Sequence, residues 1–132
     1  MRDGVEPTKA VAIIGASKNR SKFGNKAVRA YVIRGWNVYP IHPTARQIEG
    51  LPVYRSILDI PGHVHRASLY LPPAVGVDVL EEIAQKGVDE FFVNPGAESD
   101  DLIQRARFLG LHPICACSIV NIGMSPEALS EA

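Results

Sequence analysis

Short apolar runs recur along the chain and alternate with stretches of helical periodicity. The runs are Val11–Ala16, Val38–Ile41, Ala67–Leu71, Glu90–Val93 and Leu111–Ala116. They are mostly uncharged, which is typical of strands that are buried on both faces of a parallel sheet. The pattern therefore predicts five parallel strands.

The segments between these runs have apolar residues three and four positions apart, as in helices with one buried face. The three stripes comprise Ala27, Val28, Tyr31 and Val32; Val75, Val79, Leu80 and Ile83; and Leu102, Ile103, Ala106 and Leu109. Each stripe ends at a glycine (Gly35, Gly87 or Gly110), the residue that most readily closes a helix. Strand–helix alternation with right-handed crossovers predicts an α/β fold: a single Rossmann-like, doubly wound domain whose five-stranded parallel sheet has the order 3-2-1-4-5.

Serines mark three helix starts. Ser99 precedes two acidic residues and predicts an N-cap, because acids are favourable in the first turn of a helix. Ser56 predicts a one-turn helix that ends near Pro61, and Ser125-Pro126 predicts a short final helix.

Length and charge limit the functional classes. A chain of 132 residues predicts one domain, with a core at about 9–117 and a short extension at 118–132. Lys plus Arg and Asp plus Glu both number 14, so the formal net charge of +0 gives no overall attraction to nucleic acid or to an anionic membrane. Any anion site must therefore be local.

The cysteines and the start of the chain indicate a cytoplasmic protein. Cys115 and Cys117 match neither a disulfide framework nor a paired zinc motif, so we expect buried, reduced thiols. Residues 1–7 are polar and lack the apolar core of a signal peptide, and no apolar run approaches the ~20 residues that span a bilayer.

Open parallel sheets bind ligands beyond the carboxyl ends of their strands, where the strand order reverses. This rule selects four loops, at 15–24, 41–46, 71–74 and 93–99. The first loop has Gly15 for a tight turn, the Ser17 hydroxyl and the cations Lys18, Arg20 and Lys22, so it predicts a diphosphate site. It lacks the G-x-G-x-x-G spacing, and a solvated turn with surface lysines is the alternative.

The second loop separates the candidate nucleotides. The second strand ends in Ile41-His42-Pro43, without the acid that usually holds the ribose hydroxyls of NAD, whereas Arg46 suits a phosphate. A phosphorylated ribose therefore fits best, which leaves coenzyme A and NADP as candidates. For His42, a ligand contact and an ordinary strand-end role stay equally open.

The third and fourth loops predict the remaining walls of the site. Leu71-Pro72-Pro73-Ala74 has no ionisable group, so it offers a stiff apolar face for adenine or simply starts a helix. The fourth loop, Asn94-Pro95-Gly96, leads into the capped helix and could lie beside a pantetheine arm. The predicted cofactor-binding residues are Gly15, Ala16, Ser17, Lys18, Asn19, Arg20, Lys22, Gly24, Asn25, His42, Pro43, Arg46, Leu71, Pro72, Val93, Asn94, Pro95 and Gly96.

Four segments together resemble the stand-alone CoA-binding domain proteins, which are similar to the nucleotide-binding domain of the succinyl-CoA synthetase α subunit. They are Gly15-Ala16-Ser17, Tyr39-Pro40-Ile41-His42-Pro43, Ile48-Glu49-Gly50 and Asn94-Pro95-Gly96. The resemblance covers about 9–117. It implies that residues 17–20 contact the CoA diphosphate, that the loop after Pro43 with Arg46 approaches the phosphorylated ribose, and that residues 93–95 flank the pantetheine.

These observations favour a binding module for CoA or an acyl-CoA that is not an enzyme. The four histidines, His42, His63, His65 and His112, are not grouped with a nucleophile and an acid. No third metal ligand is evident beside His63 and His65, so we interpret them as a surface pair and predict no metal site. An NAD(P)-binding sensor or regulatory subunit is the main alternative, and a docking surface with an empty loop is a third. A protein partner or a homo-oligomer stays open.

Overall fold

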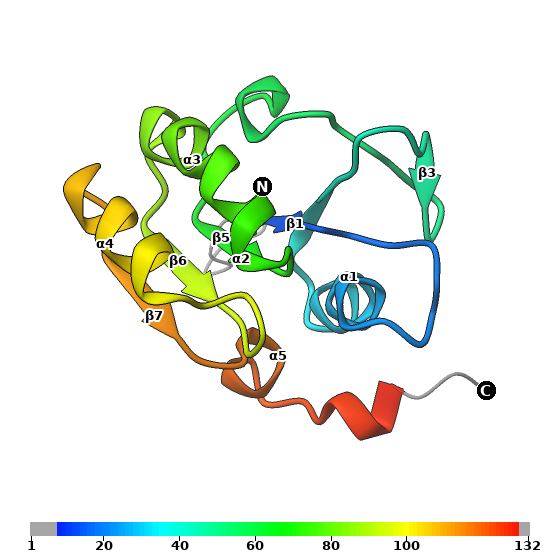
Figure 1. The fold of residues 1–132 in the computed structure, drawn as a ribbon. Helices are drawn as coiled ribbons and strands as arrows, with labels where there is room; N and C mark the ends of the chain where they lie inside the picture. Colours follow the sequence, from blue (N-terminus) through cyan, green and yellow to red (C-terminus); the bar gives the residue numbers. More distant parts are fainter. Residues whose placement is uncertain (1–7, 130–132) are drawn as a thin grey trace.

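The computed structural model describes residues 8–129, in which a parallel sheet lies between two layers of helices (Figure 1). The sheet strands are β1 (Ala10–Ile14), β2 (Asn37–Ile41), β5 (Arg66–Leu69), β6 (Glu90–Val93) and β7 (Pro113–Cys115). A separate hairpin consists of β3 (Gln47–Ile48) and β4 (Leu51–Pro52). The predicted α/β class and the five parallel strands are confirmed.

The structure has helices at the three predicted stripes and a further helix at Ser118–Asn121 that was not predicted. The helices are α1 (Phe23–Ile33), α2 (Pro73–Gly76), α3 (Leu80–Lys86), α4 (Asp100–Phe108) and α5 (Ser118–Asn121), with 3₁₀ turns η1 (Ile57–Asp59), η2 (Val77–Val79) and η3 (Pro126–Leu129). Ser56 and Ser99 accept hydrogen bonds from the backbone N–H of Leu58 and Leu102, so both predicted caps are confirmed. The helix-closing glycines Gly35, Gly87 and Gly110 all have positive φ angles, as predicted.

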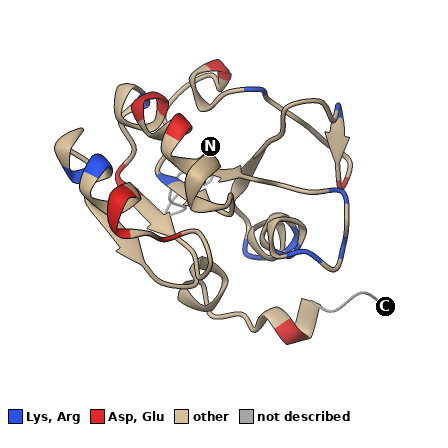
Figure 2. Cartoon of the chain, viewed as in Figure 1, with Lys and Arg blue, Asp and Glu red and all other residues tan. Residues whose placement is uncertain are grey.

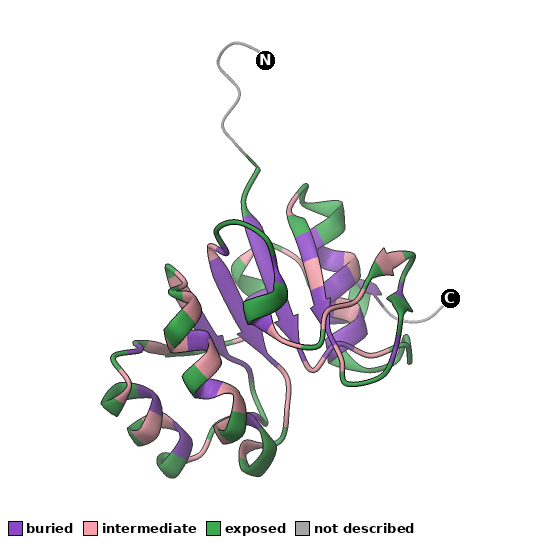
Figure 3. Cartoon of the chain, turned by 90° about the horizontal axis from the view of Figure 1, so that it is seen from above, coloured by how far each residue is buried: buried purple, intermediate pink, exposed green. Residues whose placement is uncertain are grey.

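The central strands of the sheet are buried (Figure 3), and every residue of β1 belongs to the buried class. The side chains of β1 alternate between two apolar clusters, one on each face of the sheet. Ala12 and Ile14 pack with residues of η1, α3 and α4, whereas Val11 and Ile13 pack with α1, α5 and η3. A strand with this double burial needs apolar residues at every position, and the sequence supplies them. The division into a core at 9–117 and an extension stays a prediction, although Ile119 and Leu129 belong to the second cluster.

The order of the strands corrects the predicted order 3-2-1-4-5. The sheet runs β2-β1-β5-β6-β7, which is 2-1-3-4-5 when its strands are numbered along the chain. The third sheet strand thus pairs with β1 and not with β2. Pro40 explains this. Its carbonyl, on the side away from β1, accepts a hydrogen bond from the Tyr54 N–H. On that same side proline has no N–H with which to pair a further strand. β2 is therefore an edge strand.

The two cysteines are also placed differently from the prediction. Both thiols are free, but Cys115 is exposed and Cys117 is partly exposed. β7 is the other edge strand of the sheet and has only three residues, so its side chains lack cover from a further strand. Among the described residues, no helix has the length and apolar character needed to cross a bilayer.

Candidate functional site

A cleft of about 730 Å³ opens beyond the carboxyl ends of the strands, within the usual volume of small-molecule sites. The chain leaves β1 toward β2 on one side and leaves β5 toward β6 on the other, so the strand order reverses between β1 and β5. Adjacent loops diverge at such a reversal. The lining residues are Gly15, Ala16, Ser17, Ser21, Lys22, Phe23, Gly24, His42, Pro43, Tyr70, Leu71, Pro72, Pro95, Gly96 and Ala97. All four loops selected from the sequence contribute to this cleft.

Two glycines bring the first loop and α1 close to the sheet. Gly15 ends β1 with a φ of +93°, and a Cβ there would crowd the backbone of Tyr70. A Cβ on Gly24 would overlap the carbonyl oxygen of Gly15, so the first turn of α1 packs directly against the end of β1. Gly24 therefore has the role of the packing glycine in a dinucleotide-binding fingerprint, although the spacing differs.

The amino end of α1 faces the cleft without a side-chain cap. Lys22 is the N-cap residue, and no hydrogen bond from its side chain caps the helix within the described residues. The next two residues, Phe23 and Gly24, line the cleft together with Lys22. The free N–H groups and the dipole of an 11-residue helix favour an anion at this end. Basic residues also colour the loop from β1 to α1 in Figure 2.

The first loop is shaped by hydrogen bonds of its own. The Ser17 Oγ accepts the Asn19 N–H at 3.0 Å, and the Asn19 Oδ1 accepts both the N–H and the hydroxyl of Ser21. Asn19 therefore stabilises the conformation of the loop and does not line the cleft. This local bonding fixes the backbone before any ligand arrives.

A second network fastens the loop to α1 and to the β3–β4 hairpin. The fully buried Asn25 donates from Nδ2 to the Ser17 carbonyl and to Glu49 Oε2, and its Oδ1 accepts from Arg29. Arg20 pairs with Glu49 Oε1 at 2.9 Å. Asn25 and Arg20 thus hold the loop and do not line the cleft.

Glu49 reaches this network because the hairpin turns tightly at Glu49-Gly50. Both residues have positive φ angles, 51° and 77°, as in a two-residue type I′ turn. The Ile48-Glu49-Gly50 segment carried the family resemblance in the sequence but gave no indication that its carboxylate would anchor the first loop. The signal available in the sequence was the Glu49-Gly50 pair, because an acid followed by glycine is typical of a tight two-residue hairpin turn.

His42 is held by the backbone of the second loop. Its Nδ1 accepts the N–H groups of Thr44 and Ala45 at 3.1 and 2.9 Å, so the neutral ring carries its proton on Nε2. Arg55, which the sequence analysis missed, donates to the carbonyls of His42, Thr44 and Ala45 and braces the same loop. His42 and Pro43 line the cleft, whereas Arg46 is exposed beyond it.

Tyr70 and the residues after it form the wall at the end of β5. The Tyr70 hydroxyl is buried and has no hydrogen-bond partner within the described residues. Burial raises the pKa of Tyr70 above its ordinary value, so the side chain stays neutral. Leu71 and Pro72 extend the predicted apolar wall.

The fourth loop divides into a buried part and a part that lines the cleft. Asn94 is 2 % exposed; its Nδ2 donates to Ser68 Oγ and to the Leu69 carbonyl, and its Oδ1 accepts the Ser118 N–H. Val93 is fully buried beside it. The lining is supplied by residues 95–97. Asn94 therefore joins three strand and helix ends under the floor of the cleft.

The structure brings many of the predicted binding residues together at the cleft. Those that line it are Gly15, Ala16, Ser17, Lys22, Gly24, His42, Pro43, Leu71, Pro72, Pro95 and Gly96. Those outside the lining are Lys18, Asn19, Arg20, Asn25, Arg46, Val93 and Asn94. Four lining residues were not predicted: Ser21, Phe23, Tyr70 and Ala97. No Asp or Glu is among the described residues that line the cleft.

The fold and the cleft define a doubly wound α/β domain in which the uncapped amino end of α1 faces a cleft at the strand reversal. Residues 9–123 match the family model of the CoA binding domain. The chain therefore belongs to the CoA-binding domain family, as the resemblance implied.

Two of the curated relatives are a CoA ligase and a ligase subunit, and both are longer than this chain. The chain is 39% identical over 80 residues to the acetate–CoA ligase (ADP-forming) of Methanocaldococcus jannaschii, which covers 61% of this chain and 11% of that protein. It is 36% identical over 138 aligned residues to the acetate–CoA ligase (ADP-forming) I subunit alpha of Pyrococcus furiosus, which covers 92% of this chain and 30% of the subunit. The chain thus spans a minor part of these relatives.

Solved structures agree with the fold. A conserved hypothetical protein from Pyrococcus furiosus has a TM-score of 0.77 at 31% identity, covering 87% of this chain and 99% of its own. The apo form of the dinucleotide-forming acetyl-coenzyme A synthetase 1 of Candidatus Korarchaeum cryptofilum has a TM-score of 0.71 at 29% identity, covering 82% of this chain and 26% of the synthetase chain. The same domain therefore occurs as a small protein and within a synthetase.

Proposed function

We propose that this chain binds CoA or an acyl-CoA in the cleft and does not itself transform it. The observation that carries the proposal is the uncapped amino end of α1, which meets the glycine-hinged loop inside a cleft without a carboxylate. Such a helix end favours a diphosphate. The membership of the CoA-binding domain family supports CoA as the nucleotide.

The four walls of the cleft suggest how CoA lies. The backbone N–H groups of Phe23 and Gly24 and the Lys22 ammonium receive the diphosphate, since the N–H groups of Ser21 and Lys22 are bonded to Asn19. Arg20 is already paired with Glu49. His42 and the exposed Arg46 lie on the loop that faces the phosphorylated ribose. Leu71 and Pro72 offer an apolar surface to adenine, and residues 95–97 flank the pantetheine arm.

A binding role fits the chemistry of the lining residues. The titratable side chains among them are Lys22, His42 and Tyr70, and the Nδ1 of His42 is already occupied by backbone N–H groups. This set does not form a nucleophile activated by a base. Since the related P. furiosus protein is a subunit alpha, we propose that any acyl-CoA chemistry is performed by a partner protein or by another domain.

The free thiols at Cys115 and Cys117 favour a reducing compartment, and we propose the cytoplasm.

Isothermal titration with CoA, dephospho-CoA, NADP and NAD tests the proposal. CoA should bind, and NAD should give no heat because the second loop has no acid for a free ribose. Arg46→Ala should weaken CoA binding by about 1 to 3 kcal/mol through loss of a charge-assisted hydrogen bond, while dephospho-CoA binding stays unchanged. Arg107→Ala, an exposed arginine on α4, is the matched control.

Binding of NADP without any binding of CoA would favour the alternative of an NAD(P)-binding sensor. If neither nucleotide binds the folded protein, the function proposed for the cleft is wrong.

A further inference from the structure

A second group of chemistry-bearing side chains lies at the opposite edge of the sheet, at the amino ends of β5 and β6. His63 and His65 precede β5, and Asp89 precedes β6, the adjacent parallel strand. The N–H groups of Asp89 and Glu90 both donate to the His65 carbonyl, at 3.0 and 2.9 Å. The backbone of the sheet thus fixes the three residues side by side.

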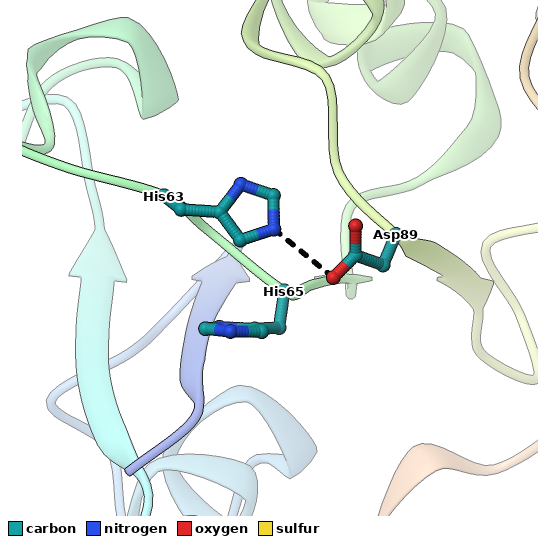
Figure 4. A group of neighbouring side chains, drawn as sticks. All are labelled: His63, His65 and Asp89. Carbon is teal, nitrogen blue, oxygen red and sulfur yellow. Dashed lines mark hydrogen bonds and ion pairs between the residues drawn. The ribbon is translucent and has the colours of Figure 1, made fainter. Parts of the chain in front are cut away.

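Their side chains lie close together, with His63 directed at Asp89 and the His65 ring beside that of His63 (Figure 4). Val64 is fully buried between the two histidines, so the alternation of an extended chain leaves both rings outside the core. His63 Nε2 lies 3.0 Å from Asp89 Oδ2, and one nitrogen or oxygen atom from each of the three residues lies within 4.8 Å of the others. The ring centroids of the histidines are 4.6 Å apart.

Two imidazoles and one carboxylate at this spacing are the donor set of a borderline divalent metal ion. Ligand atoms that share a metal at about 2.0–2.2 Å lie roughly 3–4 Å from one another. Nitrogen-rich sets select Zn²⁺, Ni²⁺, Co²⁺ or Cu²⁺ over Mg²⁺ or Ca²⁺, which prefer oxygen. We propose that His63, His65 and Asp89 form a binding site for such an ion, with solvent completing its coordination.

The site is open to ions from solution. The side chains of His63 and Asp89 are 50% and 57% exposed, so an ion reaches them without opening the core. When the metal is absent, His63 and Asp89 are paired with each other, and the ion replaces the hydrogen of that contact. His63 and Asp89 are therefore already positioned side by side to bind the ion.

His65 must change its bonding to join them. Its Nδ1 accepts the N–H of Ala10 at 3.0 Å, which places the proton of the neutral ring on Nε2. In one route the metal binds Nδ1 in place of the Ala10 N–H. In the other, the ring proton moves from Nε2 to Nδ1 and the metal binds Nε2. Either route disturbs the hydrogen bond at the start of β1, so metal binding has a backbone signature at Ala10.

Titration calorimetry with Zn²⁺ tests the proposal on the full chain in the absence of CoA, whose thiol also binds zinc. The background is Cys115→Ser with Cys117→Ser, which removes the protein's own thiols. One ion should bind per chain, and His63→Ala or Asp89→Asn should weaken binding at least about tenfold. His112→Ala removes an exposed histidine outside the group and should leave the affinity unchanged.

Nuclear magnetic resonance separates a built site from casual surface binding. Zn²⁺ should shift the imidazole nitrogen resonances of His63 and His65 and the amide resonance of Ala10, while circular dichroism shows that each variant is folded. Equal affinity in the His63→Ala, Asp89→Asn and His112→Ala variants would overturn the proposal. Zinc binding that leaves the Ala10 amide and His65 unshifted would equally overturn it.

Discussion

The two edges of the sheet use polar groups in different ways. At the carboxyl edge, loops diverge around a cleft, and the proposed diphosphate site there uses backbone N–H groups at the start of α1. At the amino edge, β5 and β6 begin side by side, and the side chains of His63, His65 and Asp89 meet on an open surface. The positions of backbone N–H groups at the cleft depend on the packing of the core beneath them. The exposed side chains at the amino edge do not need that packing to reach an ion.

The difference follows from the topology. The reversal between β1 and β5 separates neighbouring loops at the carboxyl edge, and the cleft opens there. Polar side chains near the cleft, such as Asn25 and Asn94, are used to hold loops in place. Substitutions at the two edges should therefore affect stability very unequally.

Asn94→Ala is expected to have the largest effect. It leaves the Ser118 N–H and the Leu69 carbonyl without their side-chain partner, which should lower the free energy of unfolding by about 3 kcal/mol. Urea unfolding measures this. Asn37→Ala, at an exposed position of β2, should change stability by less than about 0.5 kcal/mol. An Asn94→Ala variant as stable as its parent would contradict the claim that buried polar contacts hold the loops at the carboxyl edge.

Gly24→Ala should cost somewhat less. The added methyl group collides with the Gly15 carbonyl and forces the start of α1 away from β1, a loss of about 1–3 kcal/mol. Because the helix end moves, CoA affinity should fall as well. Lys26→Ala, on the same helix, is the control for both unfolding and binding measurements, and a Gly24→Ala protein that matches it would contradict the close approach.

Tyr70 should make the carboxyl edge sensitive to alkaline pH. Burial raises the folded-state pKa of Tyr70 above the value of about 10 in the unfolded chain. Its contribution to stability is therefore complete below pH ~10 and declines above it, as the tyrosine of the unfolded chain loses its proton first. Above pH ~10 the urea midpoint of the parent should fall further below that of Tyr70→Phe than it does at neutral pH, because phenylalanine does not titrate.

Tyr70→Phe should be no less stable than the parent at neutral pH, because the buried hydroxyl has no partner to lose within the described residues. Parallel pH profiles of the two proteins would contradict the assigned burial.

Asp89→Asn should have the smallest effect on stability. The His63–Asp89 contact is exposed on both sides, and exposed ion pairs contribute little. The urea midpoint should stay within experimental error of the parent, although zinc affinity falls. A large loss of stability would show that the amino-edge group supports the fold.

The alternation of elements could be predicted because burial on both faces of β1 and one-sided burial of α1 and α4 produce different periods. The predicted strand order was wrong, because the alternation of strands and helices along the chain is the same for both orders; Pro40 in β2 is the residue that marks an edge strand. The four loops of the cleft followed from the sheet rule alone.

The roles of individual polar residues in those loops were harder to predict. Arg20 and Asn25 have the chemistry of phosphate ligands, but Glu49 lies near both only after the β3–β4 hairpin folds back. Asp89 is similarly distant from His63 in sequence, and the pairing of β5 with β6 brings them together. Sequence spacing within one segment does not reveal such contacts.

The most direct test of the CoA site is a map of amide chemical shifts as CoA is added. The largest changes should fall at Gly15–Gly24, Tyr70–Leu71 and Gly96–Ala97, with no change at His63, His65 or Asp89. Changes confined to the amino edge, or to the depression near Arg29, Ile33 and Leu129, would contradict the proposed cleft.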